Sequence, residues 1–201
     1  MASHETRTTR ERIDITARQD PLRRRYATAP DEALITERAR TTEGTLDDPV
    51  HAWCIPGSRD YGVQWPLGIH EAVGGLHDGP NPGDLLCAAL AARMDSVVRM
   101  IANRHGVELR SLEVDVEGDV EGDVDVRGTR WVSREVPVGF QRLRCRVRLT
   151  PAPDTDPALV QRLLKAAEAS CVNLQTLRHG VTVETCHQIT TTNGTSPSPA
   201  R

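Results

Sequence analysis

Aromatic residues make up 3% of this 201-residue chain, and its formal net charge is −3. Nucleic-acid binding usually depends on a basic surface, and binding of single strands also uses aromatic side chains on which bases stack. Long hydrophobic runs are missing too: no stretch approaches the roughly 18 apolar residues of a membrane span, and the start MASHETRTTRERID lacks the apolar core of a signal peptide. We therefore expect no nucleic-acid or membrane partner and a cytoplasmic location.

The chain also lacks any Cys-x-x-Cys pair. A disulfide framework or a cysteine-based zinc site requires paired or clustered cysteines. The cysteines present are odd in number and widely spaced: Cys54, Cys87, Cys145, Cys171 and Cys186. We expect free thiols that mostly pack as small hydrophobic side chains, with no metal ion and no cofactor.

The length of the chain suits one domain with polar ends. The ends have few apolar residues and no steady periodicity, which is typical of segments outside a core. We expect an N-terminal arm over residues 1–20, a domain over residues 21–190 and a disordered tail over residues 191–201.

The first part of the domain is predicted to contain strands and a long loop. Residues 21–30 and 32–44 are predicted strands on either side of a turn at Pro30-Asp31, and a third strand is expected over residues 50–55. Residues 56–84 are dense in glycine and proline, so they are predicted to form a loop of the length that is usually functional or at an interface.

A helix is predicted from the segment NPGDLLCAALAARMDSVVRM onward. Asn81 can cap it, Pro82 suits its first position, and Asp84 places a carboxylate in its first turn. It is expected to run to about His105 and to stop at Gly106. The polar residues that share one narrow side of this helix, leaving the rest for burial, are Asp84, Asp95, Arg99 and Asn103.

An arginine interrupts the apolar side of the same helix. At about 100° per residue, Arg93 falls among Leu86, Leu90, Val97 and Ile101. A cation on a buried face is costly unless it reaches water, has a partner or belongs to a site. Arg93 is therefore a candidate site residue.

Residues 112–126 alternate with a period of two, as do residues 140–149 (FQRLRCRVRL). The first segment carries an acidic row, and the second carries Arg142, Arg144, Arg146 and Arg148 on one face. We predict antiparallel neighbours whose opposite charges face one another, with a bend at Gly118 and Gly122. A straight row of carboxylates does not fold around a calcium ion, so this pairing is favoured over a metal site.

A second helix is predicted to begin after Asp154, Thr155 or Asp156 and to end at Gly180, with a final strand over residues 181–189. Cys171 lies within it and has two alternative interpretations. If the helix breaks at Ser170, Cys171 occupies a helix N-terminus, where amide dipoles favour a thiolate. If the helix is unbroken, Cys171 is a buried structural cysteine.

Three histidines lie in or near the long loop: His51, His70 and His77. Their spacing does not match the His-x-x-x-His pair of a helical metal site. Ordinary loop histidines are therefore the favoured interpretation.

Several segments together resemble the OsmC/Ohr-like family (osmotically inducible protein and organic hydroperoxide resistance protein). They are GGLHDGPNPGDLLCAALAARMDS, EGDVDVRGT with VPVGFQRLRCRVRL, and SCVNLQTLRHGVTVE, in the family's order. The resemblance implies an α+β fold in which curved antiparallel sheets wrap two central helices of an intertwined homodimer. It also implies that a cysteine on the first helix attacks an organic hydroperoxide and then forms a disulfide with a cysteine on the second.

The sequence departs from that pattern at the reacting positions. The family's second cysteine matches Cys171, but the first aligns with Arg93. The glutamate that follows Asn-Pro in the family is Gly83 here, with Asp84 next, and the segment ATAPDE offers no activating arginine. Cys87 lies roughly 120° around the helix from Arg93, so it is no direct replacement.

Two functions follow as alternatives. In the first, the protein is a peroxiredoxin-like hydroperoxide reductase of the stress-response type, with Cys171 as its single redox thiol, Arg93 stabilising the thiolate and an external thiol as reductant. In the second, a non-catalytic dimer binds a small apolar or anionic ligand whose charged end Arg93 holds. Asp84, Cys87 and Asp95 are further candidate ligand-binding residues.

Overall fold

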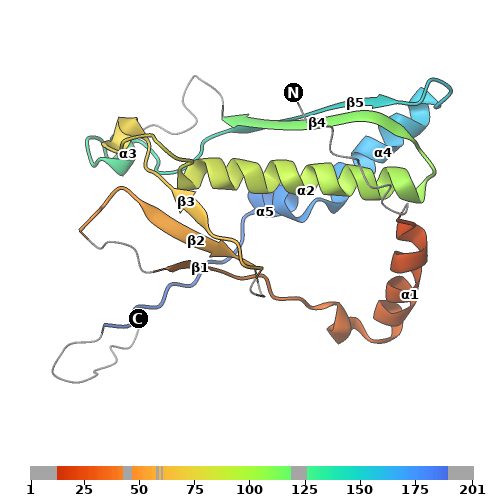
Figure 1. Ribbon diagram of the computed structural model, residues 1–201, viewed down its shortest axis with the longest axis horizontal. Helices are drawn as coiled ribbons and strands as arrows, with labels where there is room; N and C mark the ends of the chain where they lie inside the picture. Colours follow the sequence, from red (N-terminus) through yellow and green to blue (C-terminus); the bar gives the residue numbers. More distant parts are fainter. Residues whose placement is uncertain (1–12, 43–46, 58, 60, 119–125, 190–201) are drawn as a thin grey trace, which may run out of the picture.

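A long helix, α2 (Pro82–Arg104), runs through the middle of the computed structural model (Figure 1). The structure describes residues 13–42, 47–57, 59, 61–118 and 126–189. The helix begins as predicted, because the Asn81 side chain accepts hydrogen bonds from the first amides while the Asp84 carboxylate accepts one from the Asn81 amide, forming a capping box. It ends before Gly106, whose φ of 68° favours glycine.

The buried side of α2 starts one turn later than its sequence pattern predicts. Its buried side chains are Leu90, Met94, Val97, Val98 and Ala102. Leu86 is 39% exposed, so its expected burial is wrong. The buried cluster of the molecule includes residues of α2 from Leu90 onward, and Leu86 lies outside it.

A two-stranded antiparallel sheet, β4 (Leu109–Gly118) and β5 (Leu143–Pro151), covers one side of α2. The predicted pairing is confirmed, because Glu113 lies opposite Arg148, Asp115 opposite Arg146 and Glu117 opposite Arg144. The Arg148 guanidinium lies 3.1 Å from the Glu113 carboxylate. The remaining acidic residues and Gly122, within residues 119–125, lie outside the described part of the chain.

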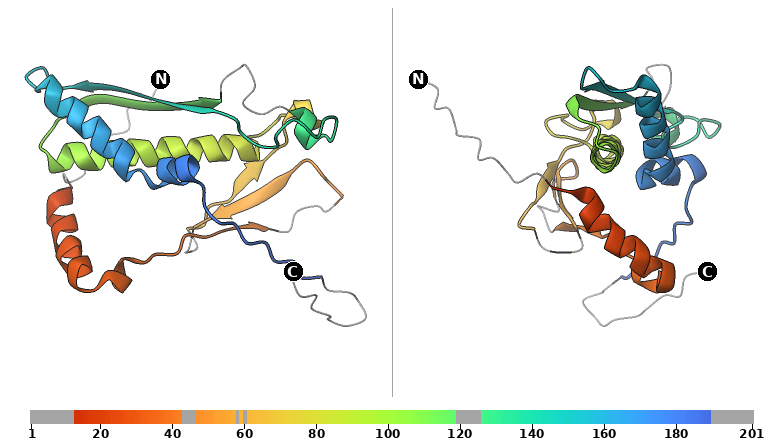
Figure 2. Two further views of the ribbon diagram at one scale, coloured as in Figure 1. Left: turned by 180° about the vertical axis from the view of Figure 1, so that it is seen from behind. Right: turned by 90° about the vertical axis from the view of Figure 1, so that its right-hand side faces the viewer.

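Two helices, α4 (Pro157–Ser170) and α5 (Val172–His179), cover another side of α2 (Figure 2). The Asp156 side chain caps α4 by accepting a hydrogen bond from the Ala158 amide at 2.8 Å. The chain leaves helical geometry at Cys171, where ψ is 103°, so the predicted single helix is two helices. Ser170 does not cap α5, because its hydroxyl donates to the Ala166 carbonyl within α4.

A second antiparallel sheet lies on the side of α2 away from the β4–β5 pair (Figures 1 and 2). It consists of β1 (Ala39–Thr42), β2 (Ala52–Pro56) and β3 (Trp65–Leu67). The strand expected over residues 50–55 is confirmed by β2, whereas the one expected over residues 32–44 shortens to β1 after a 3₁₀ turn, Pro30–Ala33. The predicted loop also holds β3 and a 3₁₀ turn, Glu71–Val73, and the short α3 (Val126–Thr129) lies further along the chain.

The strand expected over residues 21–30 is wrong, because this segment belongs to helix α1 (Ile15–Thr28). Asp14 caps the helix by accepting hydrogen bonds from the Thr16 and Ala17 amides. Tertiary contacts also hold it: the Asn103 side chain accepts from the Ile15 amide at 2.9 Å and donates to the Ile13 carbonyl at 3.0 Å. These contacts with α2 lie far along the sequence, so local periodicity did not reveal them. The helix crosses the boundary drawn between residues 20 and 21.

The strand expected over residues 181–189 is also wrong, since this segment has no regular structure. Its apolar side chains Val181, Val183 and Ile189 are exposed. A strand needs a neighbouring edge for its backbone hydrogen bonds, and no strand pairing is described for this segment. The described chain is therefore an α+β fold with two small antiparallel sheets.

Among the residues that the structure describes, no helix has the length and hydrophobicity to span a membrane.

Candidate functional site

A groove of about 490 Å³ lies between α1 and one side of α2. Residues at positions 93, 97, 100 and 104 recur at intervals of four, three and four, so they share one face of the helix. This face of α2 lines the groove with Arg93, Val97, Met100, Ile101 and Arg104. The opposite wall consists of Gln19, Leu22, Arg23 and Tyr26 from α1, and Ser170 completes it.

Two of the arginines that line the groove each have a buried nitrogen without a hydrogen-bond partner among the described residues: Arg93 Nε and Arg104 Nη1. Arg104 uses its other terminal nitrogen, Nη2, to bind the Asp20 carboxylate at 2.6 Å. That hydrogen bond holds the pKa of Asp20 below its ordinary value. A buried donor without an acceptor is costly, so both arginines that line the groove have an unmet hydrogen-bond requirement.

The charges around the groove also favour an anion. Three arginines line it, Arg23, Arg93 and Arg104, while Asp20 is the acidic partner described for Arg104. The surfaces between the arginines are apolar, with Val97 and Met100 on α2. A molecule with an anionic end and an apolar body matches this arrangement.

Cys171 follows a groove-lining residue in the sequence, but it does not line the groove itself. Its neighbour Ser170 lines the groove, whereas the Cys171 side chain is 0% exposed and belongs to the buried cluster. Both interpretations of Cys171 were therefore partly right: the helix does break there, and the thiol is nevertheless buried. The predicted approach of Arg93 to Cys171 stays a prediction.

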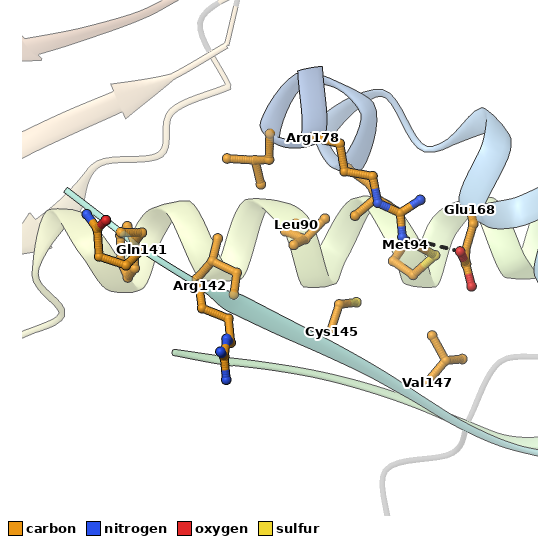
Figure 3. A pocket seen from close by; sticks show the side chains of 12 residues that line it. Leu90, Met94, Gln141, Arg142, Cys145, Val147, Glu168 and Arg178 are labelled. Atoms are coloured by element: carbon orange, nitrogen blue, oxygen red, sulfur yellow. Dashed lines mark hydrogen bonds and ion pairs between the residues drawn. The ribbon is translucent and has the colours of Figure 1, made fainter. Parts of the chain in front are cut away.

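A second pocket, of about 450 Å³, brings another cysteine close to the α4–α5 junction (Figure 3). Cys145 on β5 lines it together with Met94 of α2, Glu168 of α4 and Arg178 of α5. The Arg178 guanidinium binds the Glu168 carboxylate at 3.3 Å across the pocket. Burial is the main cause that raises the pKa of the Cys145 thiol, the proximity of Cys171 and the carboxylates of Glu168 and Asp115 add to it, and Arg178 opposes them.

Asp84 and Cys87 line a third cavity, of about 620 Å³, at the N-terminus of α2. The Asp84 carboxylate accepts hydrogen bonds from the Asn81 amide at 2.8 Å and from its side chain at 2.6 Å, so it already serves the helix cap. Burial and the Asp84 charge raise the pKa of the Cys87 thiol. This cavity places two of the candidate ligand-binding residues together, away from the groove.

Asp95 lines neither the α1–α2 groove nor the cavity at the N-terminus of α2. Its carboxylate forms an ion pair with Arg99 one turn along α2, with an N–O distance of 2.6 Å. Both residues belong to the polar side of the helix that the sequence indicated. The structure therefore separates Asp95 from Arg93, Asp84 and Cys87.

The three loop histidines form two separate arrangements. His51 lies between two carboxylates, with Nδ1 2.6 Å from Asp48 and Nε2 3.0 Å from Asp78. The hydrogen bond to Asp48, then that to Asp78, raises the pKa of His51. The His70 and His77 rings pack with their centroids 4.3 Å apart. In the described part of the chain, no three or more histidine, cysteine or acidic side chains are arranged to hold a metal ion.

The sequence analysis missed Arg104, Arg23 and Cys145. The spacing of Arg104 from Arg93 was readable, since eleven helical positions return to nearly the same face. Arg23 could not be found, because its segment was assigned to a strand. The sequence analysis includes Cys145 only among the cysteines expected to pack as small hydrophobic side chains.

One family model and several solved structures are similar to this chain. The family model described as OsmC-like protein matches residues 75–185. The fold is similar to that of an OsmC-like protein from Mycoplasma pneumoniae, with 12% identity, a TM-score of 0.54, and coverage of 73% of this chain and 89% of that one. It is also similar to an OsmC-like protein of unknown function from Vibrio cholerae, with 12% identity, a TM-score of 0.56, and coverage of 71% and 94%.

A third similar structure is an organic hydroperoxide resistance protein from Elizabethkingia anophelis. It is 18% identical, with a TM-score of 0.51 and coverage of 73% of this chain and 91% of that one. Identities this low show a shared fold only. Among curated proteins, no sequence matches this chain significantly.

Proposed function

The chain belongs to the OsmC-like protein family, and on this premise we propose that it is a homodimeric binding protein for a small, partly apolar anion held in the α1–α2 groove. The observation that carries the proposal is the pair of buried nitrogens, Arg93 Nε and Arg104 Nη1, which lack partners among the described residues and whose side chains line one groove. The groove volume of about 490 Å³ lies within the range of small-molecule sites.

The chemistry of the groove suggests how such a ligand is held. The anionic group accepts hydrogen bonds from the Arg93 guanidinium, a planar donor suited to a carboxylate. The apolar body lies along Val97 and Met100 toward Arg104. Burying apolar surface there contributes about 25 cal/mol for each Å² removed from water, and the arginines select for charge.

We favour binding over catalysis because neither of the two family cysteine positions presents an accessible thiol in this chain. The first aligns with Arg93, which cannot act as a thiol nucleophile. The second, Cys171, is 0% exposed, so a hydroperoxide has no direct contact with its sulfur in this conformation. Thiol peroxide chemistry needs a thiolate that the substrate can reach.

Hydroperoxide reduction by Cys171 is the second candidate function. The family resemblance places Cys171 at a reacting position, and the helix breaks at that residue rather than running through it. In this mechanism Arg93 stabilises the Cys171 thiolate, and an external thiol reduces the oxidised sulfur. Cys171 must then become accessible in the active protein.

A second copy of the chain is the partner that we propose for both functions. Trp53 and Trp65 on the three-stranded sheet are partly exposed, as are Val181 and Val183 of the C-terminal segment. Exposed apolar groups on several elements are typical of a subunit interface. Exchange of elements between two chains, as in an intertwined dimer, covers such surfaces.

Isothermal titration calorimetry with two matched probes tests the binding function. Decanoate supplies a carboxylate and an apolar chain, and decanol supplies the same chain without the charge. We expect decanoate to bind saturably and decanol to bind at least about tenfold more weakly, because the charged hydrogen bonds to Arg93 contribute about 1.5–3 kcal/mol. Equal affinity for the two probes, or no saturable binding of decanoate, would contradict an anion site.

A further inference from the structure

Two cysteines from different parts of the chain lie against the same buried cluster. Cys171 is a member of that cluster, and Cys145 packs against it from the helix-facing side of β5. The pocket that Cys145 lines also includes Glu168 and Leu174, which stand three positions before and three after Cys171. Cys145 therefore faces the short stretch of chain that contains Cys171, and Figure 3 shows it near Met94, with Glu168 approaching from α4.

The two thiols differ in access to solvent. Cys145 is half-buried and borders an open pocket of about 450 Å³, whereas Cys171 is 0% exposed. A small oxidant that enters the pocket can reach Cys145, which lines it, but not Cys171, which belongs to the core.

We propose that Cys145 and Cys171 are a redox pair that forms a reversible disulfide joining β5 to the α4–α5 junction. The pair goes beyond anion binding and does not depend on the groove, and it supplies the second thiol that the hydroperoxide candidate lacks at Arg93. The assignment rests on both cysteines, because Cys171 belongs to the buried cluster and Cys145 packs against that cluster.

The chemistry balances with a hydroperoxide as oxidant. The Cys145 thiolate attacks the outer peroxide oxygen, so the O–O bond breaks, Cys145 becomes a sulfenic acid, and the leaving oxygen takes a proton to form the alcohol. The Cys171 sulfur then attacks the Cys145 sulfur, the S–O bond breaks, and water leaves with the Cys171 proton. Two thiols have lost two electrons in all, and a dithiol reductant returns them by exchange.

The electrostatics of the pocket give this reaction a pH dependence. Burial and the neighbouring negative charges raise the pKa of the Cys145 thiol, and Arg178 opposes them. The thiolate is the reacting species, so oxidation is expected to be slow at neutral pH and to accelerate as the pH rises past the ordinary thiol range of about 8.5. The pH dependence of disulfide formation at Cys145, followed by mass spectrometry, measures this effect.

The backbone at Cys171 suits the movement that the bond requires. A disulfide brings its two sulfurs to about 2 Å and its Cα atoms to roughly 4.4–6.8 Å. Cys171 is the junction residue between two helices and has extended backbone geometry. The Cys171 carbonyl accepts a hydrogen bond from the Gln175 amide at 2.9 Å at the start of α5, so the movement must keep or replace this bond.

Intact mass spectrometry of the full-length protein, before and after treatment with hydrogen peroxide, tests the pair. We expect the oxidised protein to lose the mass of two hydrogen atoms and to regain it with dithiothreitol. Arg144 and Arg146 flank Cys145, so mapping should use a protease that does not cleave at arginine. The expected product is one peptide pair joined through Cys145 and Cys171.

Matched variants keep the assignment falsifiable. Cys145→Ser and Cys171→Ser should each abolish the mass loss, whereas Cys54→Ser and Cys186→Ser should keep it. Substitution in the core can itself unfold the protein, so peptide mapping of the unmodified protein decides the question without any substitution. A stable sulfenic acid with no bond, a bond between other cysteines, or no oxidation across the pH series would overturn the proposal. Each of these results leaves the decanoate measurement, and thus the binding function, unaffected.

Discussion

Arg93 and Arg104 lie eleven positions apart on α2, and both side chains line the groove beneath α1. Eleven steps of about 100° return to nearly the same face, so Val97 and Met100 lie between the two cations. Each guanidinium has one buried nitrogen without a partner among the described residues. Two donors separated by an apolar strip form the pattern that an amphipathic anion would match.

Replacing Arg93 with glutamine should weaken decanoate binding by about tenfold or more, because a hydrogen bond to a charged group is lost. Arg99→Gln is the matched control: Arg99 lies on the same helix but pairs with Asp95, so affinity should stay unchanged. Calorimetric titration of the two variants gives the comparison. Unchanged affinity in Arg93→Gln would remove Arg93 from the site.

Arg104→Gln should also weaken decanoate binding, but it breaks the ion pair with Asp20 as well. Asp20→Asn separates the two effects, because it breaks the same pair and leaves the cation in the groove. We expect Asp20→Asn to retain or improve affinity, measured in the same titration. If it weakens binding as much as Arg104→Gln does, the role of Arg104 is to hold α1 in place.

The stability contributed by His51 should depend on pH. Hydrogen bonds to Asp48 and Asp78 raise the pKa of His51 above 6.5, so its contribution is complete below that value and is lost as pH rises through the raised value. The pKa values of Asp48 and Asp78 are lowered, so their contributions are lost only on acidification through those lowered values. The parent should therefore exceed His51→Gln in Tm at about pH 6 by more than at about pH 8.5, on either side of the histidine range.

His187→Gln controls for the removal of a histidine as such, since His187 is an exposed residue of the C-terminal segment. Its Tm difference from the parent should be the same at both pH values. A His51→Gln difference that also stays constant with pH would show that the contacts with Asp48 and Asp78 do not depend on a charged imidazole.

Asn81→Ala should destabilise the protein by about 1 kcal/mol, the usual cost of losing a helix N-cap. The Asn81 side chain accepts hydrogen bonds from the Gly83 and Asp84 amides at 2.8 and 3.3 Å. Asn81→Ser keeps an accepting oxygen at the same position, so it should retain most of the stability. Urea denaturation followed by circular dichroism measures both, and equal loss in the two variants would argue against the cap as the cause.

Light scattering at micromolar concentration should show a dimer, because isolated chains leave apolar side chains exposed on the three-stranded sheet and the C-terminal segment. Val183→Asp places a charge within that segment and should shift the population toward monomer. Thr182→Asp adds the same charge at the neighbouring, polar position and should shift it less. A folded monomeric parent would contradict the proposed assembly.

Helices α2 and α4 and the charged strand pair were largely predictable because their signals are local. Asn81, Pro82 and Asp84 mark the start of α2 through cap chemistry that involves only neighbouring amides. The facing rows of Glu113 and Arg148 follow from a period of two on each strand, and charge complementarity selects the partner. The position of Arg93 among apolar residues was likewise visible from helical spacing alone.

Sequence alone therefore determined the family, the main helices, the β4–β5 pairing and the suspicion attached to Arg93, since each depends on residues within a few turns or strand lengths. Tertiary structure decided the rest. Helix α1 is held by contacts with Asn103 and Arg104, the burial of Cys171 depends on α2 and β5, and Cys145 meets the α4–α5 junction only when the sheet packs against the helices. These are contacts between residues far apart in the chain, and a local pattern carries no information about which distant surfaces will meet.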